Sequence, residues 1–213
     1  MDLRLAFYLL VGLLVGMIAR EFARSFVATR IGDPTPRLWG RLSLNPRSWF
    51  EPFGSGLLPG LIVALWAVGS NFLPPPFAYA KPAPVDPARW RNTRRDAIVI
   101  SLAGPVANVA VAAVAGVLLR AGTTGEAGFF LVAFLLANVT LAVGHLLPIP
   151  GLDGARIVGV FLPPRAAEVY RHADQYLPLI ILVVFFLLAN PLLTIVDAFS
   201  NVLCRLLAGF NCR

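Results

Sequence analysis

The chain has 213 residues, of which 58% are hydrophobic and 14% charged, and its mean hydropathy is +0.76. A composition this apolar excludes a soluble globular domain and indicates a polytopic membrane protein. The net charge of +7 would suit a nucleic-acid partner. Most arginines, however, lie in short segments between apolar stretches, where retention of positive charge on the cytoplasmic side explains them. We therefore expect the lipid bilayer, and no nucleic acid, as a partner.

The apolar stretches that are long enough to cross a hydrocarbon core of roughly 30 Å predict the transmembrane helices. They lie at residues 3–26, 97–119, 129–147 and 176–199, the last broken near Asn190 and Pro191. The first has neither a basic start nor a small-residue cleavage site, so we expect a retained helix and not a signal peptide. Residues 32–53 contain several prolines and should form short strands or extended segments. The fold class is thus an all-α polytopic membrane protein, with residues 1–213 as one domain.

Residues 54–73 are also apolar, but glycine and proline crowd the start of this segment. Basic residues lie on both sides of it, within residues 30–47 and 81–95. A full crossing would place one basic cluster outside, against the positive-inside tendency, so we favour a re-entrant hairpin over a spanning helix. Both termini are then predicted outside, and residues 153–175 cytoplasmic.

The polar end of the first helix carries the pentapeptide Arg20-Glu21-Phe22-Ala23-Arg24. With histidine at both ends it would be an H-E-x-x-H motif, in which the residues at i and i+4 bind one zinc ion and the glutamate is the general base. A guanidinium group is always protonated and offers no lone pair, so neither arginine can be a metal ligand. The pentapeptide therefore has the spacing of a zinc motif without its two histidines.

Three further motifs follow this pentapeptide along the chain. They are Y-A-K-P-A-P-V at 79–85, A-G-P-V-A-N at 103–108 and L-L-P-I-P-G-L-D-G at 146–154. Together with Glu21-Phe22-Ala23, their order and spacing closely resemble the site-2 protease family of intramembrane zinc metalloproteases, in particular its short bacterial members. The resemblance covers roughly residues 8–160. It implies a transmembrane core built by the helices that carry the motifs, in a multi-pass protein of a bacterial inner membrane.

The resemblance also implies roles for individual positions. Glu21 matches the general base and Asp153 the third zinc ligand, while Arg20 and Arg24 occupy the two histidine positions. His145 stands where family members usually carry asparagine, a departure that also affects any substrate contact of that asparagine. We therefore interpret Glu21 and Asp153 as vestigial, and predict that zinc is absent and that the protein has no cofactor.

Charge counting predicts what replaces the metal. An intact site balances a dication against two carboxylates, and here two guanidinium groups face the same two carboxylates. Since charges persist inside membranes only when they are paired, we expect a salt-bridge network of Arg20, Arg24, Glu21 and Asp153. The alternative is that both arginines extend to the cytoplasmic interface.

A partner groove is expected beside this network, with His145, Asn108 and Lys81 as its residues. His145 should be a helix-end residue that bonds to backbone, Asn108 an interhelical hydrogen bonder, and Lys81 part of an extended edge. Cys204 and Cys212 are the only cysteines, and they suit a disulfide if the tail faces an oxidising compartment.

Three functions remain open from the sequence. The first is a catalytically inactive homologue, or pseudoprotease, that serves as a membrane adaptor or accessory subunit and binds a transmembrane partner. The second is an active intramembrane metalloprotease with a non-standard metal site, for which His145, Glu21 and Asp153 could supply ligands. The third is a component of a transport complex, in which paired charges would mark the pathway. We favour the first, in which the protein is not an enzyme.

Overall fold

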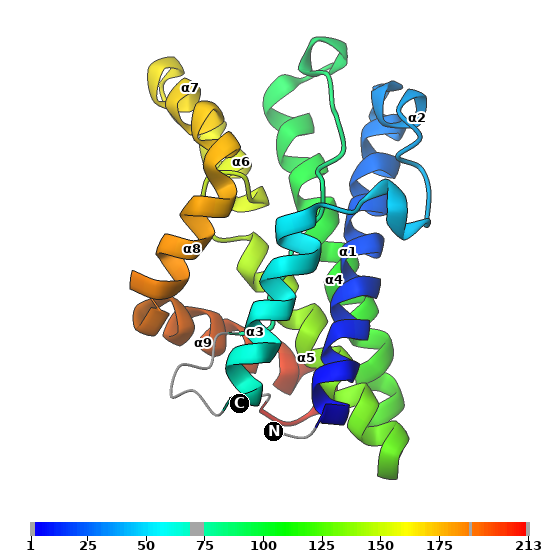
Figure 1. The fold of residues 1–213 in the computed structure, drawn as a ribbon. Coiled ribbons are helices and arrows are strands. Elements are labelled where there is room, and N and C mark those ends of the chain that lie inside the picture. The colour runs from blue at the N-terminus through cyan, green and yellow to red at the C-terminus, as the bar shows by residue number, and fades with distance from the viewer. Residues whose placement is uncertain (1–2, 69–74, 188, 212–213) are drawn as a thin grey trace.

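In a computed structural model, which describes residues 3–68, 75–187 and 189–211, the chain is almost entirely helical (Figure 1). The long helices are α1 (Leu3–Ile31), α4 (Thr93–Arg120), α5 (Gly125–His145) and α9 (Ala189–Ala208). The short ones are α2 (Thr35–Leu38), α3 (Leu58–Ala67), α6 (Asp153–Gly159), α7 (Pro164–Ala173) and α8 (Leu177–Leu187). No strand occurs in the described ranges, so residues 32–53 form short helical turns joined by extended chain. The predicted all-α class is confirmed.

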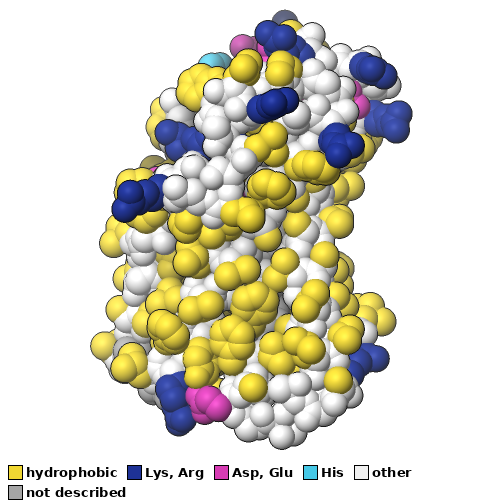
Figure 2. Space-filling model, turned by 90° about the vertical axis from the view of Figure 1, so that its right-hand side faces the viewer, with side chains coloured by type: hydrophobic (Ala, Val, Ile, Leu, Met, Phe, Trp, Pro, Cys, Tyr) yellow, Lys and Arg dark blue, Asp and Glu magenta, His cyan; other side chains and the backbone are white. Residues whose placement is uncertain are grey.

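The core of the fold is the bundle of α1, α4 and α5, which pack against one another. Within the part of the chain that the structure describes, these three helices are long and apolar enough to cross a membrane. A broad belt of apolar side chains covers the face shown in Figure 2, and most of the lysine and arginine side chains on that face gather beyond one end of the belt. This arrangement is the one expected of a polytopic membrane protein.

The fourth expected span, residues 176–199 with a break near Asn190 and Pro191, corresponds to two helices, α8 and α9. The chain changes direction between these helices (Figure 1). Pro191 falls in the first turn of α9, where a backbone N–H would have no intrahelical acceptor and its absence costs nothing. Cys204 is buried where α9 packs on α4 and α5, while Cys212 lies outside the described residues.

Contacts between helix ends fix the topology. An exposed ion pair of 3.3 Å between Arg4 and Glu126 joins the starts of α1 and α5. Arg120, at the end of α4, donates hydrogen bonds to the carbonyls of Arg205 and Leu206 in α9. The start of α1 and the end of α9 therefore lie at the same end of the molecule (Figure 1), and α2, α6 and α7 lie at the other. Which side of a membrane each end faces stays a prediction.

The segment around α3 forms a hairpin. After α3 the chain returns in extended form, and the Tyr79 N–H donates to the Gly54 carbonyl at 3.1 Å while the Lys81 N–H donates to the Trp49 carbonyl at 2.9 Å. The chain therefore enters and leaves the hairpin at one level of the molecule. Residues 69–74 lie outside the described ranges, and whether the segment is re-entrant or spans a membrane stays a prediction.

Close packing of α1 on α5 depends on a pair of glycines one helical turn apart. A Cβ on Gly12 would lie 2.8 Å from the Cβ of Ala137 and 3.2 Å from the Cα of Phe134. A Cβ on Gly16 would lie 2.6 Å from Oδ1 of Asn138. Small residues at this spacing let membrane helices approach closely.

The first prediction concerns the packing of α1 on α5 at Gly12. Gly12→Ala should destabilise the fold by about 1–3 kcal/mol relative to Gly60→Ala, because it over-packs a helix contact. Gly60 is the matched control, since it is also helical and nothing lies within 4 Å of a Cβ placed there. Thermal unfolding of both variants in the same detergent measures the difference. Equal melting temperatures would show that α1 and α5 do not pack as described.

Candidate functional site

Four charged residues are buried together where α1, α4 and α6 meet. Arg20, Glu21 and Arg24 lie on α1, and Asp153 is the first residue of α6. Their exposed fractions are 2%, 1%, 3% and 1%, respectively. Neither arginine therefore extends to the surface, and the interfacial alternative is not the arrangement found. We refer to these four residues as the charge network.

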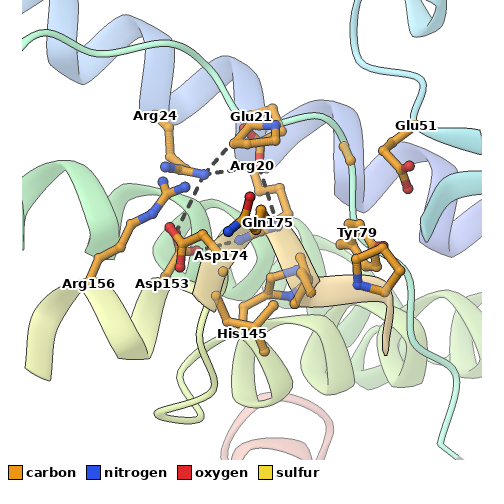
Figure 3. A pocket seen from close by; sticks show the side chains of 16 residues that line it. Arg20, Glu21, Arg24, Glu51, Tyr79, His145, Asp153, Arg156, Asp174 and Gln175 are labelled. Carbon is orange, nitrogen blue, oxygen red and sulfur yellow. Dashed lines mark hydrogen bonds and ion pairs between the residues drawn. The ribbon is translucent and has the colours of Figure 1, made fainter. Parts of the chain in front are cut away.

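Each arginine of the charge network contacts both carboxylates (Figure 3). Nη2 of Arg20 donates to Oδ2 of Asp153, and its Nη1 lies 3.4 Å from Oε1 of Glu21. Nη1 of Arg24 lies 3.5 Å from Oδ1 of Asp153 and 3.3 Å from Oε1 of Glu21. The network thus joins α1 to the start of α6 through charge-assisted contacts, which are the stronger kind of hydrogen bond.

Two glycines make room for the charge network. A Cβ on Gly104 of α4 would lie 3.2 Å from Oδ2 of Asp153 and 3.3 Å from Cδ of Arg24. A Cβ on Gly154 would lie 2.1 Å from the carbonyl oxygen of Leu146, which is backbone and cannot move aside. The glycines of the A-G-P and L-D-G motifs therefore let α4 and the turn after α5 close around the charges.

The extended segment after the hairpin also reaches the charge network. The backbone N–H of Ala83 donates to Oε2 of Glu21 at 3.3 Å. Glu21 is consequently held from three sides, by Arg20, by Arg24 and by the main chain at Ala83.

His145, the last residue of α5, lies beside the charge network. Its Nδ1 is 2.9 Å from the carbonyl of Leu141, one turn earlier, which confirms the predicted bond from a helix-end histidine to backbone. Because a carbonyl only accepts, the ring proton sits on Nδ1 and Nε2 carries the lone pair. The ring stacks on Phe77 at 4.8 Å between centroids, and Nε2 is buried without a hydrogen-bond partner in the described structure.

A cavity of about 260 Å³ opens beside the charge network. Besides the network it is lined by Glu51, Tyr79, Ala80, Pro82, His145, Leu152, Arg156, Asp174 and Gln175, among others. His145 thus takes its expected place. Asn108 and Lys81 do not line the cavity, which corrects the predicted groove.

Geometry explains both corrections. Asn108 is fully buried toward α1, and its Nδ2 lies 3.1 Å from the position of a Cβ on Gly16. Its amide has no hydrogen-bond partner in the described part of the chain, so the expected interhelical bond is absent there. Lys81 is exposed, and its backbone N–H points away from the cavity to Trp49.

Sequence reasoning missed the other charged groups of this cavity. Arg156 extends from α6 toward Arg24 and Asp153 (Figure 3). Its position three residues after Asp153 placed it on the same helix face, a signal that the spacing contained. Glu51 and Asp174 come from distant segments, and no local pattern indicated them. Burial raises the pKa of Asp174, although the Gly151 backbone N–H partly opposes the shift.

The charge network does not fit zinc. A catalytic site needs three protein ligands and an open position for water, whereas both carboxylates here are occupied by guanidinium groups. His145 is the one imidazole at the cavity, and no cluster of three or more metal-ligating side chains occurs in the residues described. Two fixed positive charges would also repel a dication strongly at low dielectric.

The fold and the site together define an integral membrane protein with a charged site buried near one end of its helix bundle. Comparison with known proteins places this class in a family. The chain is 32% identical over 189 residues to "Putative zinc metalloprotease YwhC" of Bacillus subtilis, covering 84% of this chain and 80% of that protein. It is 37% identical over 172 residues to "Putative zinc metalloprotease Rip2" of Mycolicibacterium smegmatis.

A Rip2 protein of Mycobacterium tuberculosis is 34% identical over 170 residues. The two Rip2 matches cover 79% and 76% of this chain but only 61% and 60% of those relatives. No family model and no solved structure matches the chain. The long YwhC match, together with the motifs, shows that the chain belongs to the site-2 protease family.

The second prediction tests the energetic role of the charge network. Asp153→Asn should destabilise the fold by about 3–5 kcal/mol, because it leaves buried guanidinium charges uncompensated. Glu168→Gln is the control, since this carboxylate is 61% exposed and lies 3.8 Å from Nε2 of His172 in a surface pair, so little loss is expected. Thermal unfolding in detergent compares the two. A loss for Asp153→Asn no larger than for Glu168→Gln would contradict a buried, stabilising network.

Proposed function

We propose that this protein is a catalytically inactive site-2 protease homologue that binds a transmembrane partner, as an adaptor or an accessory subunit. The observation that carries the proposal is the double engagement of Glu21 and Asp153 by the two arginines. These carboxylates match the general base and a zinc ligand of an active enzyme. Here they serve as the anionic half of a structural ion-pair network.

An active enzyme with a non-standard metal site is the competing proposal. It would need Nε2 of His145 and both carboxylates to release the guanidinium groups and converge on a metal. Removing the carboxylates from Arg20 and Arg24 would leave two buried cations unpaired, at a cost of several kcal/mol each. The geometry therefore favours the inactive protein.

The cavity beside the network supports partner binding. Its wall contains Ala80 and Pro82 of the extended segment, whose neighbours Tyr79 and Lys81 donate their N–H groups away from the cavity, to the Gly54 and Trp49 carbonyls. Alternate residues of extended chain face opposite sides, so the edge at Ala80 is directed toward the cavity. An extended partner segment could add to this edge by backbone hydrogen bonds, as peptides do at exposed strands.

A role in a transport complex has less support. Intramembrane charges that mark a pathway line a route through the bundle. The charge network instead lies near one end of α1 and is closed by Gly104 and Ala83. No observation in the described structure favours this third function.

The third prediction concerns zinc. The purified wild-type protein should contain no stoichiometric zinc by elemental mass spectrometry. Arg20→His/Arg24→His should gain about one zinc per chain, because two histidines at i and i+4 with Asp153 restore a three-ligand set. The same double variant with Asp153→Asn is the control and should lose that metal.

Either of two results would contradict the proposal that the protein is catalytically inactive. Stoichiometric zinc in the wild type that disappears with Asp153→Asn would show that the natural site binds metal. Zinc-dependent cleavage of a transmembrane substrate by the wild-type protein would show the activity directly.

The fourth prediction concerns the partner. A photo-crosslinking residue at Pro82, in the cavity wall, should give a discrete protein adduct in native membranes. The same residue at Val114, which is 64% exposed on α4, should give lipid adducts only. The adaptor proposal fails if Pro82 and Val114 yield the same adducts, or if Pro82 yields none.

A further inference from the structure

A second cavity lies between the start of α4 and the helices α6 and α7, separate from the site of the proposed function. Its volume is about 410 Å³, larger than that of the cavity beside the charge network. Three arginines from three different helices line it, Arg94 of α4, Arg156 of α6 and Arg171 of α7. The presence of three arginines along one hollow is the feature to explain.

These arginines lack counter-charges. None of the three forms an ion pair with a residue in the described ranges, although other arginines of the chain do. The acidic residue that lines the cavity is Asp174, which sets one carboxylate against three guanidinium groups. The cavity therefore holds an excess of positive charge, and an anion is the ligand it would attract.

The other lining groups define what kind of anion fits. Thr93 adds a hydroxyl group, which can donate to an oxygen atom of a ligand, whereas the Tyr170 hydroxyl donates to the Pro148 carbonyl at 3.4 Å. Planar guanidinium groups bind the oxygens of phosphate bidentately, and arginine clusters are the usual protein site for this group. The rest of the wall is small and apolar, with Ala97, Ala155 and Ala167 among its residues. The site would thus bind a phosphate group next to an apolar wall of the cavity.

The surroundings of the cavity place it at a membrane interface. Phe161 and Val169, in the α6–α7 region, are 75% and 67% exposed, as expected of side chains that contact lipid. This end of the molecule is also the one that the positive-inside tendency assigns to the cytoplasm. Phosphate headgroups of anionic lipids lie at this depth and attract basic residues.

We propose that the cavity between α4, α6 and α7 binds a phosphate group through Arg94, Arg156 and Arg171, supplied by an anionic lipid headgroup or by a free phosphate ester. Arg156 also lines the cavity beside the charge network. A phosphate bound here would neutralise Arg156, which forms no ion pair with a carboxylate of the described residues.

The test uses purified full-length protein in neutral detergent. The probes are short-chain phosphatidylglycerol, short-chain phosphatidylcholine and glycerol 3-phosphate, and the readouts are melting temperature and retention of the probe in native mass spectra. Phosphatidylglycerol should raise the melting temperature and remain bound, and phosphatidylcholine should not. If glycerol 3-phosphate alone gives the same shift, the source is a free phosphate ester, and if it gives none, the source is the lipid.

Matched variants separate the cavity from general surface charge. Arg94→Gln/Arg171→Gln should weaken binding of the effective probe about tenfold or more, because charge-assisted hydrogen bonds are lost. Arg91→Gln/Arg165→Gln removes the same charge from the same end of the molecule, at residues that do not line the cavity, and should bind normally. The proposal is overturned if both double variants respond equally, or if no probe shifts the wild-type protein.

A second kind of variant keeps every charge and fills the cavity with a side chain. Gly159 lines the cavity, and nothing lies within 4 Å of a Cβ placed there. Gly159→Leu should therefore fold normally and lose binding of the same probe by a similar factor. Full binding by this variant would show that the arginines attract the probe from the surface, and would contradict a phosphate site in the cavity.

Discussion

The structure depends on the rule that charges buried in a membrane protein must be paired. Taking Arg20, Arg24, Glu21 and Asp153 out of water costs several kcal/mol per ion, and only close contact between opposite charges offsets that cost. The pairing fixes the start of α6 against α1, and Gly104 supplies the space on α4 in which the pairs form. In an enzyme of the family a zinc ion would stand at the positions that the two arginines hold. Under the proposed function, the change from metal to guanidinium would preserve a link between helices while removing the chemistry that activates water.

Many of the helices could be predicted from the sequence because a membrane helix is recognised by its length and hydropathy, and both can be read from a single sequence. The helices 3–26, 97–119 and 129–147 were predicted close to α1, α4 and α5 as the structure has them. Residues 176–199 were predicted as one span with a break near Asn190 and Pro191, and the structure has two helices there, α8 and α9, because an apolar run does not fix the angle at which a chain turns. At the site, charge balance indicated the pairing of the arginines with Asp153. It could not indicate Glu51 or Asp174, which reach the cavity through tertiary packing alone, nor the burial of Asn108 against Gly16.

Arg156 connects the two basic features of the molecule. It belongs to α6, the helix that Asp153 begins, and it lines both the cavity beside the charge network and the second cavity. The balanced network needs no further cation, so Arg156 carries charge that an external anion can match. A partner bound at the Ala80 edge and a phosphate bound beside α7 would then act on the same short helix. If both proposals hold, ion pairs and anion binding take the place of metal chemistry on the scaffold of the family.

A double-mutant cycle between Arg20 and Asp153 tests the central claim most directly. Arg20→Met and Asp153→Leu each leave one buried charge unpaired, and each should cost about 3–5 kcal/mol of unfolding free energy. The double variant retains Arg24 with Glu21 as a neutral pair, so its loss should be smaller than the sum of the two single losses by about 0.5–3 kcal/mol. Thermal or denaturant unfolding in one detergent supplies all four values. Additive losses would show that Arg20 and Asp153 are not coupled, and would contradict the replacement of a metal link by an ion pair.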